Sequence, residues 1–399
     1  MQTVQKVTDD IYYIGASDAR NFLFENIYPV NGMTYNAYLI CDEKTVLTDT
    51  CDESVRPLFL ENLNKALNGR ELDYIFVHHM EPDHCAVLSD VLTTFSKAQI
   101  VCTAKTQTMI KQFFNVDITD RVLLVKEGDS LSTGRHTFNF YMAPMVHWPE
   151  VMVSYDTTDK VLFSADAFGT FGTLNGKLFA DMWNLEKEWL DEARRYYTNI
   201  VGKYGQPVQT LLKKAGTLDI QLICPLHGPV WRKDLGWLLD KYQKWSTYTP
   251  EENAIVLIYG SIYGHTGNAV DVLAGKLAKK GITNIRVYDA SHIHPSYLVA
   301  EAFRASHLVI GSVTYNNGIF PTIETVLLDF KAHNLQNRAV TLIQNGSWAP
   351  TSGKQMLELF NQMKDMRIRE NILTVFSALK PEQGAELDSL ATLLAEELV

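Results

Sequence analysis

The densest group of residues able to bind a metal lies between positions 77 and 84, in the sequence Val-His-His-Met-Glu-Pro-Asp-His. Its nitrogen and oxygen donors are His79, Glu81, Asp83 and His84. The apolar run 74–77 predicts a buried strand, and Pro82 argues against a regular helix or central strand at this point. We therefore expect a loop at a strand end, where α/β proteins usually place their chemistry. One isolated His-x-Glu would suit a polar loop, whereas the full spacing favours a metal site.

Three later apolar runs each lead to one further donor. The runs and the residues that follow them are 138–146 with His147, 161–165 with Asp166, and 222–226 with His227. A lone His or Asp after a strand is usually an ordinary loop residue. Together these residues predict strand ends that converge on one edge of a fold.

The resulting donor set is too large for one tetrahedral zinc, and it suits two metals that share a bridging carboxylate. Imidazoles and carboxylates with open coordination positions favour redox iron, although zinc or manganese also fits such donors. His78 is expected to point away from its neighbour His79 and to be structural.

The elements that position these donors divide into two regions. We predict a first domain over residues 1–248, a polar linker over 249–253, and a second domain over 254–399. Short strand-like runs mixed with helical stretches such as 54–67 and 186–203 predict a layered α/β fold for the first domain. The predicted strands there are 11–14, 38–40, 45–47, 74–77, 99–102, 122–125 and 138–142.

The second domain alternates strands and helices, which predicts a doubly wound parallel sheet. The predicted strands are 254–259, 285–288, 307–310, 339–343 and 372–376. The predicted helices are 268–280, 297–305, 323–332, 353–364 and 382–398.

The first strand–helix loop of this domain, residues 260–268, reads Gly-Ser-Ile-Tyr-Gly-His-Thr-Gly-Asn and contains no Lys or Arg. Hydroxyls and backbone N–H groups at a helix N-terminus can bind a phosphate without a basic side chain. The loop is neither a Walker loop nor a Gly-x-Gly-x-x-Gly fingerprint. Two later loops, 312–318 and 345–349, carry Tyr315 and Trp348, whose flat apolar faces suit a planar ring.

The spacing His-x-Glu-x-Asp-His, followed by His, Asp and His at long intervals, resembles the metallo-β-lactamase fold. Hydrolytic members usually have His at the position of Glu81, and this exchange resembles the flavodiiron proteins (A-type flavoproteins). The resemblance implies a metallo-β-lactamase-like αββα sandwich followed by a flavodoxin-like doubly wound parallel sheet.

The resemblance also implies an assignment of ligands. One iron is bound by His79, Glu81 and His147, and a second by Asp83, His84 and His227, with Asp166 bridging. In some family members the position of His84 does not ligate. The residues that resemblance places in the wall of the pocket are Trp148, Tyr196 and Tyr197, and each is equally consistent with an ordinary core aromatic.

The loop 260–268 resembles the flavodoxin phosphate loop, which implies flavin mononucleotide (FMN) as a second cofactor. Tyr263 stands at one of the usual hydroxyl positions, and Val313 stands where the family often has Pro. A similar domain without flavin, as in response regulators, needs an acidic cluster after its first strand, which is absent here. The predicted FMN-binding residues are Ser261, Tyr263, Gly264, His265, Thr266, Val313, Thr314, Tyr315, Asn316, Gly318, Gly346, Ser347, Trp348 and Ala349.

By resemblance, electrons pass from rubredoxin or a similar donor through FMN to the two irons, which reduce O2 to water, NO to nitrous oxide, or both. A head-to-tail homodimer or a dimer of dimers is implied. One alternative is a zinc hydrolase fused to a flavodoxin-like module, against which Glu81 argues. A second is an electron carrier whose first domain is only a scaffold.

Composition narrows the other classes of function. The net charge of −10 argues against nucleic acid as the main partner, because phosphate binding needs a basic surface. No apolar run is long enough to span a membrane, and the N-terminus lacks a signal-peptide core. Five cysteines without a Cys-x-x-Cys pair predict a reducing, cytoplasmic location.

Overall fold

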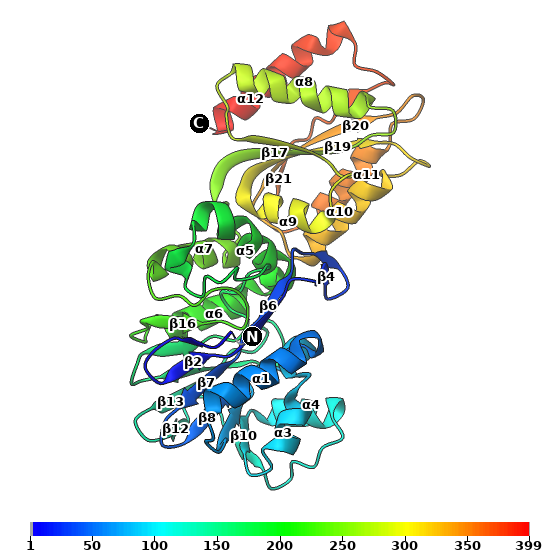
Figure 1. The fold of residues 1–399 in the computed structure, drawn as a ribbon. Coiled ribbons are helices and arrows are strands. Elements are labelled where there is room, and N and C mark those ends of the chain that lie inside the picture. The colour runs from blue at the N-terminus through cyan, green and yellow to red at the C-terminus, as the bar shows by residue number, and fades with distance from the viewer. Residues whose placement is uncertain (1–2, 399) are drawn as a thin grey trace. The chain divides into compact units, whose positions relative to one another are not determined.

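The computed structural model describes residues 3–398, and these form two compact units (Figure 1). The first unit comprises the chain through Tyr197 together with Gln206–Gln243, and the second comprises Thr198–Gly205 together with the chain from Lys244 onward. The predicted linker 249–253 lies within the second unit, where strand β17 already begins at Glu252. The domain limits drawn from the sequence stay a proposal.

The first unit is built on two large sheets. The seven-stranded sheet contains, in spatial order, β1 (Gln5–Lys6), β2 (Ile11–Tyr13), β7 (Tyr38–Cys41), β8 (Thr45–Thr48), β9 (Tyr74–Phe76), β10 (Gln99–Cys102) and β11 (Val122–Leu124). The five-stranded sheet contains β12 (Ser130–Ser132), β13 (Thr137–Met142), β14 (Met152–Asp156), β15 (Val161–Phe163) and β16 (Leu222–Cys224). Two small hairpin sheets pair β3 (Ala16–Asp18) with β6 (Met33–Tyr35) and β4 (Leu23–Phe24) with β5 (Tyr28–Pro29).

The core of this unit lies between the two large sheets. Ile40, Val46 and Phe76 of the first sheet pack in one buried cluster with Phe138 and Phe163 of the second. Figure 1 places helices beside both sheets, which gives the expected sandwich of sheets between helices. The helices are α1 (Arg56–Leu67), α2 (Pro82–Cys85), α3 (Leu88–Thr94), α4 (Ala104–Phe113), α5 (Leu190–Tyr196), α6 (Gly205–Ala215) and α7 (Leu235–Ser246).

Two local predictions need correction. Pro82 does not hold the ligand segment in a loop but begins the short helix α2, so Asp83 and His84 lie in a helical turn. Proline is favoured at the first helical position, where its missing N–H has no partner in any case. The predicted helix 186–203 is interrupted, because π-helical turns at Leu185–Trp189 and Tyr197–Val201 flank α5. Such turns are often found at functional sites.

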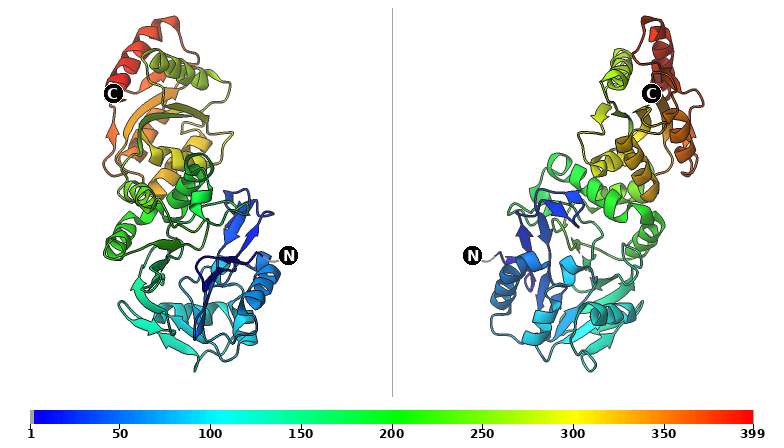
Figure 2. Two further views of the ribbon diagram at one scale, coloured as in Figure 1. Left: turned by 60° about the vertical axis from the view of Figure 1, so that its left-hand side comes forward. Right: turned by 90° about the vertical axis from the view of Figure 1, so that its right-hand side faces the viewer.

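The second unit is a parallel sheet with helices on both faces (Figure 1, Figure 2). Its strands are β18 (Ile285–Asp289), β17 (Glu252–Gly260), β19 (Ala305–Val313) and β20 (Ala339–Asn345) in spatial order, followed by β21 (Arg367–Ile368) and β22 (Leu373–Val375), which both pair with β20. The second strand in sequence thus lies outside the first, which is the flavodoxin-like order.

Alternate residues of these strands face opposite helical layers, because successive strand side chains point to opposite faces. Val256 and Ile258 pack in the cluster shared with α9, α10 and α11, whereas Ile255 and Leu257 pack with α8 and α12. The helices are α8 (His265–Lys279), α9 (Pro295–Arg304), α10 (Pro321–Ala332), α11 (Ser352–Phe360) and α12 (Gly384–Leu398). Among residues 3–398, none of these or the other helices has the length and apolar character to cross a membrane.

Candidate functional site

The predicted metal ligands gather at strand ends of the first unit in two groups. The first group is His79, Glu81, His147 and Asp166, and the second is Asp83, His84 and His227. In each group the possible ligand atoms lie within 4.8 Å of one another. β9, β15 and β16 each end a few residues before one of these side chains, which explains why residues from 79 to 227 meet.

Asp166 lies between the two groups and presents one carboxylate oxygen to each. Its Oδ2 is 3.3 Å from Nε2 of His79 and 3.2 Å from Nε2 of His147. Its Oδ1 is 3.1 Å from Nε2 of His84 and 3.8 Å from Nε2 of His227. A carboxylate in this position can bridge two metals.

The other carboxylates each belong to one group. Glu81 Oε2 lies 3.1 Å from His79 Nε2 and 3.0 Å from His147 Nε2. Asp83 Oδ2 lies 3.1 Å from His227 Nε2 and 3.4 Å from His84 Nε2. Each group thus combines imidazole nitrogens with carboxylate oxygen.

Several donor atoms of this site lack an ordinary hydrogen-bond partner. Both carboxylate oxygens of Asp83 and of Asp166 are buried without one among the described residues. Nε2 of His84 lies 3.1 Å from Nε2 of His227, so two ring nitrogens face each other. Burial of polar atoms in this state is costly unless a charge compensates it. One cation in each group would compensate these charges and give the donor atoms a partner, so the residues fit a two-metal centre.

The electrostatics of the donor set agree with this interpretation. Burial favours the neutral acid, yet the charges of His84 and His79 hold the pKa of Asp166 well below its usual range. Burial also favours neutral imidazoles, yet neighbouring carboxylates raise the pKa of His84 and of His147 to about 9. Metal affinity should therefore fall as pH falls, because protons compete with metal ions for the ring nitrogens.

His78 is held away from the metal groups, as predicted from the sequence. Its Nδ1 bonds Asp49 Oδ2 at 2.6 Å and its Nε2 bonds Ser154 Oγ at 2.8 Å. Both ring nitrogens are therefore occupied. Asp49 also accepts the backbone N–H of His78 at 2.7 Å, so it fixes the chain just before the ligands.

Two further groups form hydrogen bonds to the ligand histidines and could not be predicted from the sequence. Glu150 Oε1 lies 2.8 Å from Nδ1 of His79 and accepts the backbone N–H of Met80 at 2.9 Å. The backbone carbonyl of Thr34 lies 2.5 Å from Nδ1 of His227. Partners of this kind orient ligating imidazoles and fix the nitrogen that faces the metal.

Aromatic rings surround the ligands. The ring centroid of Trp148 is 5.2 Å from that of His79, and the centroid of Tyr196 is 5.6 Å from that of His227. Tyr197 packs on Tyr242 with centroids 5.1 Å apart. Phe24, which the sequence did not single out, also lies on His227 at 5.6 Å.

A cavity of about 570 Å³ opens onto Glu81 and Asp83, and it is rich in carboxylates. Burial and the nearby charge of Glu81 raise the pKa of Glu25 to about 8. Glu25 lies at the turn between β4 and β5, where its φ is 51°. The lining residues, most of them absent from the sequence prediction, are Asp18, Asn21, Leu23, Phe24, Glu25, Asn26, Tyr35, Asp52, Ser54, Glu81, Pro82 and Asp83.

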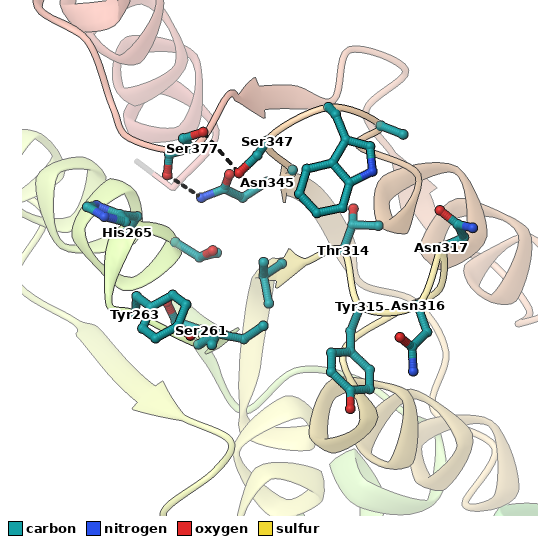
Figure 3. A pocket seen from close by; sticks show the side chains of 16 residues that line it. Ser261, Tyr263, His265, Thr314, Tyr315, Asn316, Asn317, Asn345, Ser347 and Ser377 are labelled. Atoms are coloured by element: carbon teal, nitrogen blue, oxygen red, sulfur yellow. Dashed lines mark hydrogen bonds between the residues drawn. The ribbon is translucent and has the colours of Figure 1, made fainter.

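The second unit holds a separate cavity of about 690 Å³ at the carboxyl ends of its strands (Figure 3). This volume lies in the range of small-molecule and cofactor pockets. All of the predicted FMN-binding residues line it except Gly264 and Gly318. The lining residues that were not predicted are Ile262, Asn317, Asn345 and Ser377.

The two glycines shape the loops instead. Gly264 directly precedes the first residue of α8. Its φ is 86°, a backbone conformation that residues other than glycine rarely adopt. Gly318 exchanges backbone hydrogen bonds with Tyr315 at 2.8 and 3.1 Å, which closes the loop after β19. Ser377 joins the pocket through Ser347, at 3.0 Å between the hydroxyls (Figure 3).

This pocket offers donors and flat surfaces rather than charge. The buried hydroxyl of Thr266 has no hydrogen-bond partner among the described residues, and it lies in the first turn of α8, where backbone N–H groups favour an anion. Tyr263 and Trp348 are 88 % and 89 % exposed, so their rings are available to a planar ligand. The residues therefore fit a phosphate joined to a flat ring system.

Known proteins resemble the chain over nearly its whole length. Residues 33–228 match a family model described as ODP family beta lactamase. A solved mutant of the flavo di-iron protein of Thermotoga maritima superposes with a TM-score of 0.90 at 26% identity, over 99% of this chain and 98% of that one. The anaerobic nitric oxide reductase flavorubredoxin of Shigella flexneri is 28% identical over 95% of this chain and 79% of its own.

The rubredoxin-oxygen oxidoreductase of Megalodesulfovibrio gigas is 30% identical over 90% of this chain and 89% of its own. This chain belongs to the flavodiiron proteins. The predicted fold class is confirmed, with a β-lactamase-like unit followed by a flavodoxin-like unit. As a flavodiiron protein it uses a diiron site and FMN, and the two donor groups and the pocket of the second unit fit these cofactors.

Proposed function

We propose that this flavodiiron protein is an oxidoreductase that reduces O2 to water, NO to nitrous oxide, or both. Its relatives named above include a rubredoxin-oxygen oxidoreductase and a nitric oxide reductase. The observation that carries the proposal is the position of Asp166, with one oxygen toward each of two nitrogen- and oxygen-donor groups. Such donors suit iron with open positions for a gas.

The proposed ligand assignment follows the two groups. His79, Glu81 and His147 hold one iron, and Asp83, His84 and His227 hold the other, with Asp166 shared. His84 belongs in the set because its Nε2 faces both Asp83 and Asp166. The proposed FMN site is the cavity at the strand ends of the second unit.

When bound, the irons supply electrons and coordination positions for the gas, and FMN relays electrons from a donor protein. The chain's own residues hold and enclose these groups. Trp148 and Tyr196 pack on ligand rings and limit access of water. Burial and the charges of Asp166, Glu81 and Asp83 raise the pKa of Tyr196 well above its usual range, so its phenol keeps its proton.

We further propose a rubredoxin-type electron donor and a head-to-tail homodimer or dimer of dimers. The donor is supported by the name of the 30%-identical relative. In such a dimer, the flavin pocket of one chain would face the metal-ligand groups of its partner. A monomeric active species in sedimentation at assay concentration would overturn this arrangement. We place the enzyme in the cytoplasm, in keeping with its free cysteines.

A zinc hydrolase fused to a flavodoxin-like module is less well supported. Glu81 supplies an anionic oxygen donor where the hydrolases have an imidazole. This ligand set favours ferric iron over zinc. The named relatives at 28 and 30% identity are reductases.

Turnover of both gases tests the proposal. Protein prepared without oxygen, loaded with iron and FMN, is mixed with reduced rubredoxin, and O2 and NO are followed at matched concentrations with electrodes. Rapid loss of either gas is expected. Loss of neither, in protein shown to hold both cofactors, would overturn the reductase and favour the hydrolase.

A variant separates the reductase from a simple electron carrier. Asp166→Asn removes the shared charge and is expected to abolish gas turnover while rubredoxin still reduces FMN. Asp159→Asn is the matched control, because Asp159 pairs with Arg135 outside the metal groups. Unchanged gas turnover in Asp166→Asn would mean that the first unit is a scaffold.

A further inference from the structure

Three of the four histidines that face the two metal positions differ in the hydrogen-bond partner of Nδ1, the ring nitrogen on the side away from the metal. Nδ1 of His79 meets a carboxylate, Glu150 Oε1, at 2.8 Å. Nδ1 of His227 meets a neutral backbone carbonyl, that of Thr34, at 2.5 Å. Nδ1 of His84 is buried without a hydrogen-bond partner among residues 3–398. The position that contains His79 thus differs from the one that contains His84 and His227.

Glu150 is placed to act as an anion. The residue is 2 % exposed, and its Oε1 faces two N–H groups, those of the His79 ring and the Met80 backbone. Its Oε1 can accept both because a carboxylate oxygen carries two lone pairs, and its Oε2 is buried without a hydrogen-bond partner among the described residues. The hydroxyl of Thr103 lies 3.5 Å from the Glu150 carbonyl and helps to fix the backbone that carries it.

A carboxylate behind an imidazole changes the donor strength of the opposite nitrogen. It fixes the tautomer and ring orientation and makes the metal-facing nitrogen more basic. Hydrogen bonds to ionised groups are roughly twice as strong as neutral ones. A backbone carbonyl has a smaller effect, and an unpartnered ring gains none. His79 is therefore the strongest imidazole donor of the three.

We propose that Glu150 is a positioning residue that makes the His79–Glu81–His147 position the tighter of the two metal sites. The inference rests on the diiron function proposed above and adds an order of filling to it. The first metal binds beside His79, and the second binds beside His84 and His227. Glu150 touches neither metal, and it acts through His79.

Cobalt(II) titration tests this order. Full-length protein is stripped of metal with a chelator, and Co²⁺ binding is followed by calorimetry and visible absorption. The native chain is expected to bind two Co²⁺ ions in a tight and a weaker step. Glu150→Gln keeps an acceptor oxygen for Met80 and His79 but removes the charge, and it is expected to weaken the tight step by about 10- to 100-fold.

Combining Glu150→Gln with the loss of one metal position at a time shows which position the substitution weakens. With Asp83→Ala and His227→Ala combined, the His79 position is the one that keeps its ligands, and Glu150→Gln is expected to weaken its Co²⁺ binding and shift its absorption bands. With His147→Ala, the other position remains, and Glu150→Gln is expected to leave it unchanged. Equal effects in both backgrounds, or none in either, would overturn the inference.

Asp156→Asn is the matched control for loss of a buried carboxylate. Asp156 Oδ2 lies 2.9 Å from Nδ1 of His136, a buried pair in the same unit that is outside the proposed ligand set. This variant is expected to lose stability without a change in either Co²⁺ step. A shift of the tight step in Asp156→Asn as large as in Glu150→Gln would contradict a specific role for Glu150.

Glu150→Asp keeps the charge on a shorter side chain. It provides the test of the inference if Glu150→Gln fails to fold. It is expected to keep the two-step order with a smaller loss of affinity than Glu150→Gln, and an equal loss would count against a role of charge. A native chain that binds fewer than two Co²⁺ ions would instead contradict the diiron function itself. Failure of the inference and failure of the function therefore have different signatures.

Discussion

The metal centre and the flavin pocket of this flavodiiron protein use opposite means of binding. The metal centre consists of buried, charged side chains that come from positions 79 to 227 of the first unit. The flavin pocket is lined by three short loops of the second unit and by Ser377, with hydroxyls, amides and exposed aromatic rings but no Lys, Arg, Asp or Glu. The identity of single side chains should therefore decide metal binding, whereas flavin binding should be spread over many weak contacts.

The largest effect is expected from Glu81→His. This change replaces an anionic oxygen donor by a neutral nitrogen and moves the set toward the hydrolase pattern. Loss of a residue that only hydrogen-bonds a ligand costs up to about 100-fold in activity. Because Glu81 is itself a proposed ligand, we expect gas turnover to fall by more than that. Metal analysis after growth with both metals should show zinc in place of iron, with FMN content unchanged. Retention of iron and turnover would show that the metal centre tolerates substitution as the flavin pocket does.

Arg338→Met tests the second unit away from its pocket. The guanidinium of Arg338 is fully buried and donates to five backbone carbonyls: Ala302, Phe303, Tyr248, Gln336 and Asn337. Methionine leaves these carbonyls without a donor, so we expect a loss of about 3 to 5 kcal/mol in unfolding free energy. Denaturant unfolding followed by flavin fluorescence measures it. Arg367→Met, at an exposed residue of β21, is the control and should cost far less.

His136 tests whether every buried histidine–carboxylate group of the first unit needs a metal. Its ring bonds Asp156, and the neighbouring Arg135 already bonds Asp10 and Asp159, so a cation of the protein occupies this group. Burial disfavours the charged ring, yet Asp156 and Asp10 raise the pKa of His136 from 6.5 to about 9.

The sign of the pH dependence follows from that shift. A raised pKa in the folded state stabilises the protein fully below pH 6.5, and the contribution is lost as pH rises through about 9. We expect about 3 kcal/mol of stability to disappear over this window, and His136→Gln to remove the dependence. Thermal unfolding from pH 6 to 10 measures it. A chelator should not alter this pH dependence, in contrast to its effect on the metal centre.

The smallest effect is expected from Thr266→Val in the flavin pocket. Valine keeps the shape of threonine and removes the buried hydroxyl that lacks a partner in the chain. Loss of one hydrogen bond to the phosphate should weaken FMN binding by about tenfold, or roughly 1.4 kcal/mol. Fluorescence titration of the flavin-free protein measures this change. A complete loss of FMN binding would show that the pocket depends on a single side chain, as the metal centre does.

The sequence predicted what is encoded locally. The ligand spacing from His79 to His84 and the strands before Asp166 and His227 follow from apolar runs, because buried strands leave a continuous pattern. The loop after β17 indicated a phosphate site because its glycines and hydroxyls are contiguous in the sequence, between a predicted strand and a predicted helix. The parallel sheet of the second unit followed from the alternation of strands and helices.

Other features depend on contacts that no local pattern records. Glu150 lies 71 positions from His79, and only the folded chain brings its carboxylate to that ring. Glu25, at the turn between β4 and β5, lines the same cavity as Glu81 and Asp83, from which it is more than 50 positions away in the sequence. The error at Pro82 arose because proline both ends and begins helices, and the surrounding sequence did not distinguish these roles.

The acidic cavity beside Glu81 and Asp83 has a consequence for inhibition. Asp18, Asp52, Glu81 and Asp83 give its lining a concentration of negative charge, and Glu25 adds to it only as pH rises through about 8. A neutral diatomic gas crosses such a field without cost, whereas an anion such as azide is repelled by it. We therefore expect this lining to disfavour anionic inhibitors while it leaves O2 and NO undistinguished. This protection weakens as salt screens the carboxylates.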